Sequence, residues 1–110
     1  MTRAAEPPYL YLTTTGRRSR QPREIEIWFT RSERRYYVIA ENGARAQWVQ
    51  NLRADPRVRW RVAELAFSGQ ACVVDAATEP ALNEAVQVLS REKYGWGEGL
   101  VVELTPDIDA

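Results

Sequence analysis

The sequence predicts a mainly β domain of the α+β class, a closed or partly closed barrel of about six antiparallel strands with two helices outside it. Three observations lead to this prediction. The chain has 110 residues, enough for one domain and too few for two. Hydrophobic residues make up 45% of it and charged residues 27%, which is typical of a folded globular domain. Short runs rich in β-branched and aromatic residues, separated by turns, leave room for only two helices.

The first three strands are expected between residues 9 and 40. Tyr9–Thr14 is aromatic and β-branched, and Gly16–Pro22 after it is a polar turn. Glu24–Phe29 follows as the second strand, a hairpin partner for the first. Its side chains alternate between two faces, with Ile25, Ile27 and Phe29 on one and Glu24, Glu26 and Trp28 on the other. A charged turn at Arg31–Arg34 then leads to the third strand, Tyr36–Ala40.

The rest of the chain alternates helices and strands. The predicted ranges are Ala44–Ala54 for a short helix, Arg57–Val62 and about Ala66–Val74 for two strands, and Leu100–Leu104 for the last strand. Gly69 would permit a bulge or bend in the second of these strands. The second helix opens at Thr78-Glu79-Pro80, a capping residue, an acid and a proline suited to a first turn, and ends before the glycine-rich Gly95–Gly99.

Several classes of protein are excluded by what the sequence lacks. Cys72 is the only cysteine and there is no histidine, so we expect no internal disulfide, no metal site and no Ser-His-Asp triad. No run approaches the roughly 20 apolar residues of a membrane helix, and Met1–Pro8 has no apolar signal region. We therefore expect a cytoplasmic protein without a membrane partner. If it is an enzyme, a bound cofactor would carry the difficult chemistry.

Charge is balanced overall and segregated along the chain. Residues 1–61 hold 13 arginines against 6 acidic residues, whereas residues 62–110 hold 2 basic residues against 9 acidic ones. Two solvated faces of opposite sign would explain this pattern. The alternative is an anionic ligand held by the first half, because arginine binds phosphate and carboxylate with a planar fork.

The turn after the first strand is the densest chemical signal. Thr13–Ser19 places hydroxyls, a glycine and two arginines within one turn, and Arg20 and Arg23 follow with no acidic residue between them. Such a turn can hold phosphate or carboxylate through backbone N–H, hydroxyl and guanidinium groups together. It can equally be an ordinary basic hairpin loop.

Aromatic residues suggest two further features. Trp48 and Asn51 lie one turn apart on the short helix, where the indole would either join the core or flank a planar ring at the mouth of the barrel. Tyr94 and Trp96 lie beside glycines and would either form a lid or anchor the second helix. Tyr94 is our candidate for substrate contact or proton delivery.

A nucleic-acid-binding barrel is a further alternative. Arg57, Arg59 and Arg61 share one strand face, with Trp60 and Tyr36 as candidates for base stacking. The balanced net charge argues against it, because general nucleic-acid binders carry a basic excess. We therefore expect a small-molecule partner and no nucleic acid.

Three segments carry a family resemblance. They are Leu12–Arg23 (LTTTGRRSRQPR), Trp48–Pro56 (WVQNLRADP) and the closing Val101–Pro106 (VVELTP). Together they resemble the deazaflavin-dependent nitroreductase and quinone reductase family of actinobacteria and their relatives. The likeness extends from about Tyr9 to Pro106.

The resemblance implies a single split β-barrel domain of the flavin-reductase, FMN-binding-like type over residues 1–110. It also implies coenzyme F-420, a deazaflavin with a phosphate and an oligoglutamate tail, which donates hydride to a quinone, nitroaromatic or other conjugated acceptor. By position, the residues matching its binding site are Arg17, Arg18 and Ser19 at the phosphate and tail, Arg23, Glu24, Ile25, Glu26, Ile27 and Trp28 beneath the ring, Ala40, Glu41 and Asn42 at the ring's polar edge, and Trp48, Val49, Gln50 and Asn51 beside it.

The sequence also departs from the family pattern. Arg20 stands where the family's turn usually has glycine, so the turn either takes another path or accepts a strained left-handed residue. Glu26 and Trp28 replace a proline and an aromatic residue, which changes the substrate face. We expect the chain to lack the N-terminal helix of membrane-associated members, and the sequence therefore gives no support to quinone access at a bilayer. FMN in place of F-420, a non-catalytic flavin or deazaflavin carrier, and a homodimer all stay open as expectations.

Overall fold

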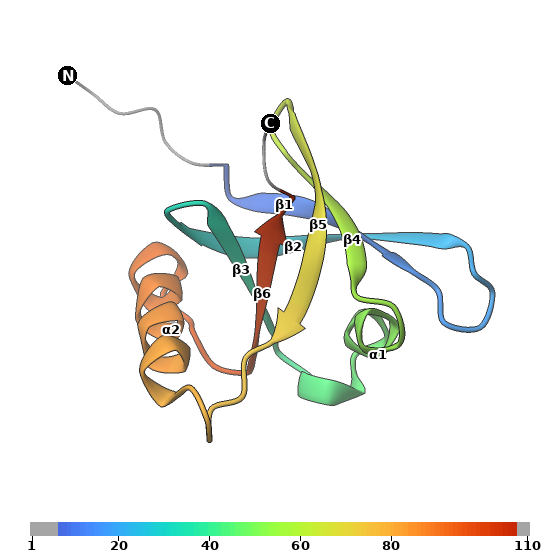
Figure 1. Cartoon of the computed structure of the whole chain (residues 1–110). Coiled ribbons are helices and arrows are strands. Elements are labelled where there is room, and N and C mark those ends of the chain that lie inside the picture. Colours follow the sequence, from blue (N-terminus) through green and yellow to red (C-terminus); the bar gives the residue numbers. More distant parts are fainter. Residues whose placement is uncertain (1–6, 108–110) are drawn as a thin grey trace.

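The structure, a computed structural model, describes residues 7–107 and has the predicted order of elements (Figure 1). The strands are β1 (Tyr9–Thr15), β2 (Pro22–Ser32), β3 (Arg35–Ala40), β4 (Arg57–Val62), β5 (Leu65–Val73) and β6 (Leu100–Pro106), and the helices are η1 (Gly43–Arg45), α1 (Gln47–Ala54) and α2 (Pro80–Tyr94). All strand pairs are antiparallel, and the strands close in the order β1-β2-β3-β6-β5-β4. The six-stranded barrel predicted from the sequence is confirmed.

Strand β2 divides its length between two neighbours. Pro22–Trp28 pairs with β1, and only Phe29–Ser32 pairs with β3, because β3 turns away after Val38 to follow β6. Among residues 7–107, no strand therefore lies beside Pro22–Trp28 on the edge of β2 that faces away from β1. We call this stretch the free edge of β2, and it is the split in the barrel.

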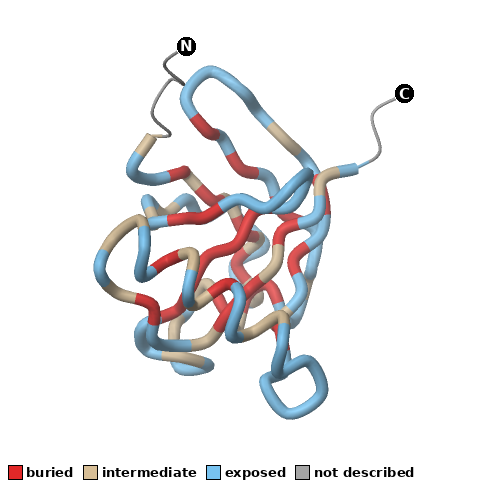
Figure 2. The backbone as a smooth tube through the Cα atoms, turned by 90° about the vertical axis from the view of Figure 1, so that its left-hand side faces the viewer, coloured by how far each residue is buried: buried red, intermediate tan, exposed pale blue. Residues whose placement is uncertain are grey.

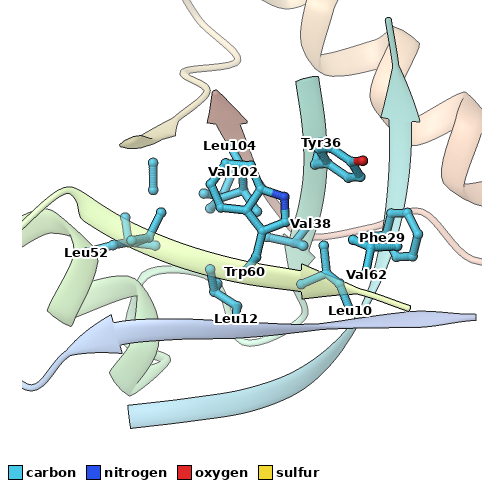
Figure 3. Packing of buried hydrophobic residues seen from close by; sticks show 12 residues of the cluster. Leu10, Leu12, Phe29, Tyr36, Val38, Leu52, Trp60, Val62, Val102 and Leu104 are labelled. Atoms are coloured by element: carbon cyan, nitrogen blue, oxygen red, sulfur yellow. The ribbon is translucent and has the colours of Figure 1, made fainter. Parts of the chain in front are cut away.

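The barrel interior is filled by side chains of alternate strand residues. Leu12, Val38, Val102 and Leu104 surround the indole of Trp60, which lies near the middle of the cluster (Figure 3). Trp60 is 2% exposed and Tyr36 3%. Because neither ring reaches the surface, they cannot form the stacking platform that the nucleic-acid alternative needed beside the arginines of β4.

The two α-helices lie on opposite sides of the barrel (Figure 1). Helix α1 contacts β1 and β5 near the hairpin turn, while α2 contacts β2 and β6. Figure 2 shows that the buried residues gather in the middle of the fold and that the protruding loops are mostly exposed. Within residues 7–107, neither helix has the length and apolar character needed to cross a membrane.

Four local expectations need correction. The first helix does not start at Ala44, because residues 43–45 form a separate 3-10 turn and Ala46 is extended, with φ −59° and ψ 135°. Strand β2 continues through Arg31 and Ser32, which leaves a two-residue turn. The N-cap of α2 is Glu79 without a side-chain bond, so Thr78 does not cap it. Gly69 makes no bulge: an added Cβ there would lie 2.0 Å from the Thr105 carbonyl oxygen, so glycine allows close approach of β6.

Tyr37 gives the fold a predicted alkaline sensitivity. It is 4% exposed, and its hydroxyl donates to Glu103 Oε2 at 3.0 Å. Burial, together with that bond to the carboxylate, raises the pKa of Tyr37 to about 12. Because the folded pKa exceeds the unfolded one, the folded state keeps its proton longer, and stability is lost as pH rises above the unfolded value towards the folded one.

We expect this residue to lower the free energy of unfolding by up to about 1.4 kcal/mol at pH 11 relative to pH 8. The measurement is urea unfolding of wild type and Tyr37→Phe at both values. The variant starts lower because it lacks the bond to Glu103, but it should lose less stability between the two pH values. Equal pH slopes for the two proteins would contradict the assignment.

Candidate functional site

The turn between β1 and β2 is closed by its own backbone. Gly16 N–H donates to the Gln21 carbonyl at 2.8 Å, Arg20 N–H to the Gly16 carbonyl at 2.9 Å, and Gln21 N–H to Ser19 Oγ at 3.2 Å. A Cβ on residue 16 would lie 2.6 Å from Ser19 Oγ, so this position suits glycine. The turn therefore has a defined shape, which an ordinary solvated loop does not require.

Arg20 keeps the left-handed conformation, with φ 61°. Of the two paths open to a turn without the family's glycine, the chain thus takes the strained one. Within the described part of the chain, its side chain makes one polar contact, an exposed ion pair with Asp55 at 3.5 Å. A side chain in this region costs roughly 1–2 kcal/mol relative to glycine.

Arg20→Gly is therefore expected to raise the free energy of unfolding by up to about 1 kcal/mol, because relief of strain is partly offset by the greater freedom of glycine in the unfolded chain. Urea unfolding measures the change. Asp55→Asn, which removes the ion pair and leaves the backbone alone, is the control and should change stability by less than about 0.5 kcal/mol. A loss of stability in Arg20→Gly that matches the loss in the control would mean that the ion pair matters more than the strain.

Beside this turn lies a hollow of about 410 Å³, which we call the anion pocket. Its lining residues are Gly16, Arg17, Arg18, Ser19, Arg23, Ile25, Gln47, Trp48 and Asn51. Arg23 Nη2 donates to Ser19 Oγ at 3.4 Å, and both side chains are exposed. No acidic residue lines the pocket, so its charge is strongly positive.

A second hollow of about 490 Å³ continues from the first, and we call it the aromatic pocket. Its lining residues are Ile27, Trp28, Ile39, Ala40, Glu41, Asn42, Ala46, Trp48 and Trp96. The half-buried Trp48 lines both pockets, so they are neighbours. The result is a groove with a cationic end and an apolar, aromatic end.

The free edge of β2 runs along this groove. Backbone groups of alternate residues on a strand point to opposite sides. Phe29 N–H and C=O both bond to the Tyr94 hydroxyl on the side of β1, so the N–H and C=O groups of Glu24, Glu26 and Trp28 face the other side, the free edge. These groups are available to hydrogen-bond the polar edge of a bound molecule.

One wall of the aromatic pocket is held by the end of α2. The Trp28 indole stacks on the Tyr94 ring, with centroids 4.4 Å apart and planes 4° from parallel, and meets Trp96 edge-on at 6.3 Å. The Tyr94 hydroxyl accepts from Phe29 N–H at 3.0 Å and lies within bonding distance of the Phe29 and Pro8 carbonyls. Lys93 Nζ donates to the same Phe29 carbonyl at 3.0 Å. Tyr94 thereby extends the hydrogen bonding of β2 beyond the start of β1.

The structure brings most of the sequence-derived candidates together. The residues that line the two pockets are Arg17, Arg18, Ser19, Arg23, Ile25, Ile27, Trp28, Ala40, Glu41, Asn42, Trp48 and Asn51. The other candidates point elsewhere. Glu24 and Glu26 face the outer side, near Arg61 and the Tyr11 hydroxyl. Val49 is fully buried in the core, Gln50 donates back to the Ala44 and Arg45 carbonyls, and Tyr94 supports the wall from behind.

Sequence reasoning did not select Gly16, Gln47, Ile39, Ala46 or Trp96 as site residues. Gln47 stands four residues before Asn51 on α1, so helical spacing alone would have placed it on the same face. Trp96 was expected only as a lid or an anchor. No pattern in the sequence distinguishes Ile39 from its neighbours in a uniformly buried strand.

Comparison with known proteins adds evidence that is independent of the geometry of the site. A family model described as F420H(2)-dependent quinone reductase matches residues 2–96. An F420H(2)-dependent quinone reductase of Mycobacterium tuberculosis is 34% identical over 64 residues, which cover 56% of this chain and 43% of that protein. The chain therefore matches less than half the length of this relative.

Solved structures agree on the fold. An F420-H2 dependent reductase, FDR-A, superposes with a TM-score of 0.73 at 18% identity, over 94% of this chain and 99% of that one. A protein solved as a domain-swapped dimer superposes with a TM-score of 0.67 at 18% identity, over 94% of this chain and 84% of that one. Both show the same split barrel, as the resemblance implied.

Proposed function

Because the chain belongs to the F420H(2)-dependent quinone reductase family, we propose that it is an oxidoreductase that uses reduced coenzyme F-420 to reduce a quinone, nitroaromatic or other conjugated acceptor. The observation that carries this proposal is the groove itself. A pocket lined by three arginines continues into one lined by three tryptophans, along a strand edge with unpaired backbone groups. A ligand in which an anionic group is joined to a planar ring needs a cationic pocket next to an apolar, aromatic one.

The residues present fit the coenzyme. Arg18, Arg23 and Ser19 supply guanidinium and hydroxyl groups for the phosphate and the start of its acidic tail. Trp48 and Ile27 supply flat apolar surface for the ring, and the free edge of β2 supplies donors and acceptors for its polar rim. Glu41 and Asn42 lie at the far polar edge. When bound, the reduced deazaflavin would supply the hydride.

The chain's own contribution is binding and orientation. Trp28 and Trp96 give the acceptor an aromatic surface beside the ring, and their indoles exclude water from that side of the pocket. Tyr94 was our sequence-based candidate for proton delivery. Its hydroxyl is occupied by backbone groups of Phe29 and Pro8, so we now propose that it acts by positioning Trp28.

Two measurements test the function. A fluorescence titration should give a dissociation constant of tens of micromolar or tighter for F-420, about −6 kcal/mol. Reduced F-420 mixed with the protein should then be oxidised when menadione or a nitroaromatic is added, with no reaction when protein is left out. Binding without oxidation would support the carrier alternative, and a preference for FMN in a parallel titration would change the cofactor. No binding of either would overturn the proposal.

The oligomeric state and the location in the cell are also proposals. We propose a homodimer, supported by the domain-swapped dimer among the structural relatives and by the exposed Leu65, which is 61% accessible. Light scattering would then give twice the 12.6 kDa of one chain.

We also propose a cytoplasmic location, supported by the single exposed Cys72, which has no partner cysteine in the sequence. Cell fractionation tests it.

A further inference from the structure

Asn51 joins the anion turn to the barrel through a buried amide. It is 6% exposed, and its Oδ1 accepts from the backbone N–H of Arg17 at 3.2 Å and from Arg17 Nη1 at 2.8 Å. Its Nδ2 donates to Thr14 Oγ1 at 3.5 Å, and Thr14 is 1% exposed. One side chain of α1 thus bonds both to the strand before the turn and to the turn. Because a buried amide is costly to leave unpaired, these bonds favour a single position for the turn.

Arg17 is held on both sides by the same helix. Besides its bond to Asn51, its Nη2 donates to Gln47 Oε1 at 2.8 Å. Gln47 and Asn51 lie one turn apart on α1, so they present two acceptors to the two ends of one guanidinium fork. Both terminal nitrogens of the Arg17 guanidinium therefore donate a hydrogen bond to α1.

Arg18 is in the opposite situation. It is exposed, it lines the anion pocket, and across residues 7–107 we find no hydrogen bond or ion pair that occupies its guanidinium. In the same described residues, the Arg23 guanidinium has only its 3.4 Å contact with Ser19. The two arginines adjacent in sequence thus have different roles in the geometry: one fixes the turn and the next is available for an anion.

We propose that Asn51 is a positioning residue, which acts through Arg17 to hold Gly16–Gln21 in an anion-binding shape so that Arg18, Arg23 and Ser19 can grip a phosphate group. The identity of the ligand as the phosphate of F-420 rests on the proposed function. The positioning role itself needs only a phosphate-type anion. Preorganisation of this kind improves affinity because the turn is not ordered at the moment of binding.

The test compares two ligands that differ in their anionic part: F-420, and the same deazaflavin without phosphate and glutamate tail. Asn51→Leu keeps the size of the side chain and removes its polar atoms. We expect F-420 to bind this variant at least about tenfold more weakly, and the tail-less deazaflavin to bind within about twofold of wild type. An equal loss for both ligands, or no loss for F-420, would overturn the positioning role.

Two other variants keep the test decisive if Asn51→Leu folds poorly. Gln47→Ala alters an exposed side chain and removes only one bond of Arg17, so F-420 affinity should fall by about threefold, again without effect on the tail-less ligand. Arg53→Ala removes a positive charge from the exposed side of α1, outside both pockets, and should leave both affinities within about twofold of wild type. If Gln47→Ala behaves like Arg53→Ala, the positioning role fails.

A readout without the coenzyme separates this inference from the proposed function. Pyrophosphate added to the wild type should shift the backbone amide signals of Gly16–Gln21 in an NMR titration, and Asn51→Leu should lose this response while the signals of β4 stay in place. If Asn51→Leu loses this response and the wild type binds no deazaflavin, the positioning role is upheld and the proposed function is refuted. A full response in Asn51→Leu would refute the positioning role.

Discussion

Arg18→Ala combined with Arg23→Ala is expected to weaken F-420 binding by at least about a hundredfold, because each charge-assisted hydrogen bond to phosphate contributes about 1.5–3 kcal/mol and about 1.4 kcal/mol corresponds to tenfold. Folding should be nearly unaffected. Both side chains are exposed, and among residues 7–107 the only bond lost is the 3.4 Å contact between Arg23 and Ser19. Fluorescence titration and urea unfolding of the same preparations measure the two quantities.

Arg53→Ala, a charge removal on the exposed side of α1, is the control for long-range electrostatics. Its effect on affinity should be small and should fade as salt is raised, since exposed charges more than about 10 Å apart are screened at 0.1 M salt. The double variant, in contrast, should keep most of its defect in salt. A parallel loss of stability and affinity in the double variant would instead make these arginines structural.

We expect Arg17→Ala and Arg18→Ala to act differently, because Arg17 fixes the turn whereas Arg18 is available for an anion. The sequence did not reveal this difference. The two residues are neighbours in a turn of uniform polarity, and the resemblance assigns both to the phosphate. Only the arrival of α1 beside the turn separates them, because Gln47 and Asn51 take the Arg17 guanidinium. These contacts join residues 30 and 34 positions apart, so they are a property of the tertiary structure, which local patterns do not encode.

The barrel itself was predictable because its strands obey simple rules. Arg57–Val62 alternates charged and apolar residues, and the structure gives it the alternating exposure that this pattern indicates. Pro56 and Gly95 mark helix ends in the sequence, and α1 and α2 stop just before them. The predicted start of the first helix at Ala44 was wrong for a local reason. Alanine favours helix, but Ala46 is extended, so α1 begins only at Gln47.

The alternation along β2 predicted the faces of Ile25, Ile27, Glu24 and Glu26 correctly, whereas the resemblance did not separate them. The resemblance named Arg23–Trp28 as a continuous run, yet in a strand only alternate side chains share a face, so Ile25 and Ile27 reach the groove while Glu24 and Glu26 point outwards. Trp28 departs from the same alternation. Its indole lines the groove because Tyr94, at the end of α2, stacks against it where β2 leaves β1.

Tyr94→Phe is expected to lower the free energy of unfolding by about 2 kcal/mol, because the buried Phe29 N–H loses its acceptor and an unsatisfied buried donor costs about 1–3 kcal/mol. The Phe29 carbonyl keeps Lys93 as a donor, and the phenyl ring of the variant can still stack on Trp28. Turnover with F-420 and menadione should therefore stay within about threefold of wild type, with an unchanged pH profile.

The alternative role of Tyr94 as a proton donor makes the opposite prediction. Loss of a general acid typically lowers the rate by about 10²–10⁴-fold and removes its limb from the pH profile. Comparison of Tyr94→Leu with Tyr94→Phe separates the ring from the hydroxyl, because the first variant removes both and the second removes only the hydroxyl. Tyr94→Leu should also raise the KM for the acceptor, because Trp28 loses the ring that stacks on it. A stable Tyr94→Phe variant with almost no turnover would assign Tyr94 to the chemistry; an unstable variant with normal turnover would assign it to the wall that holds Trp28 against the acceptor.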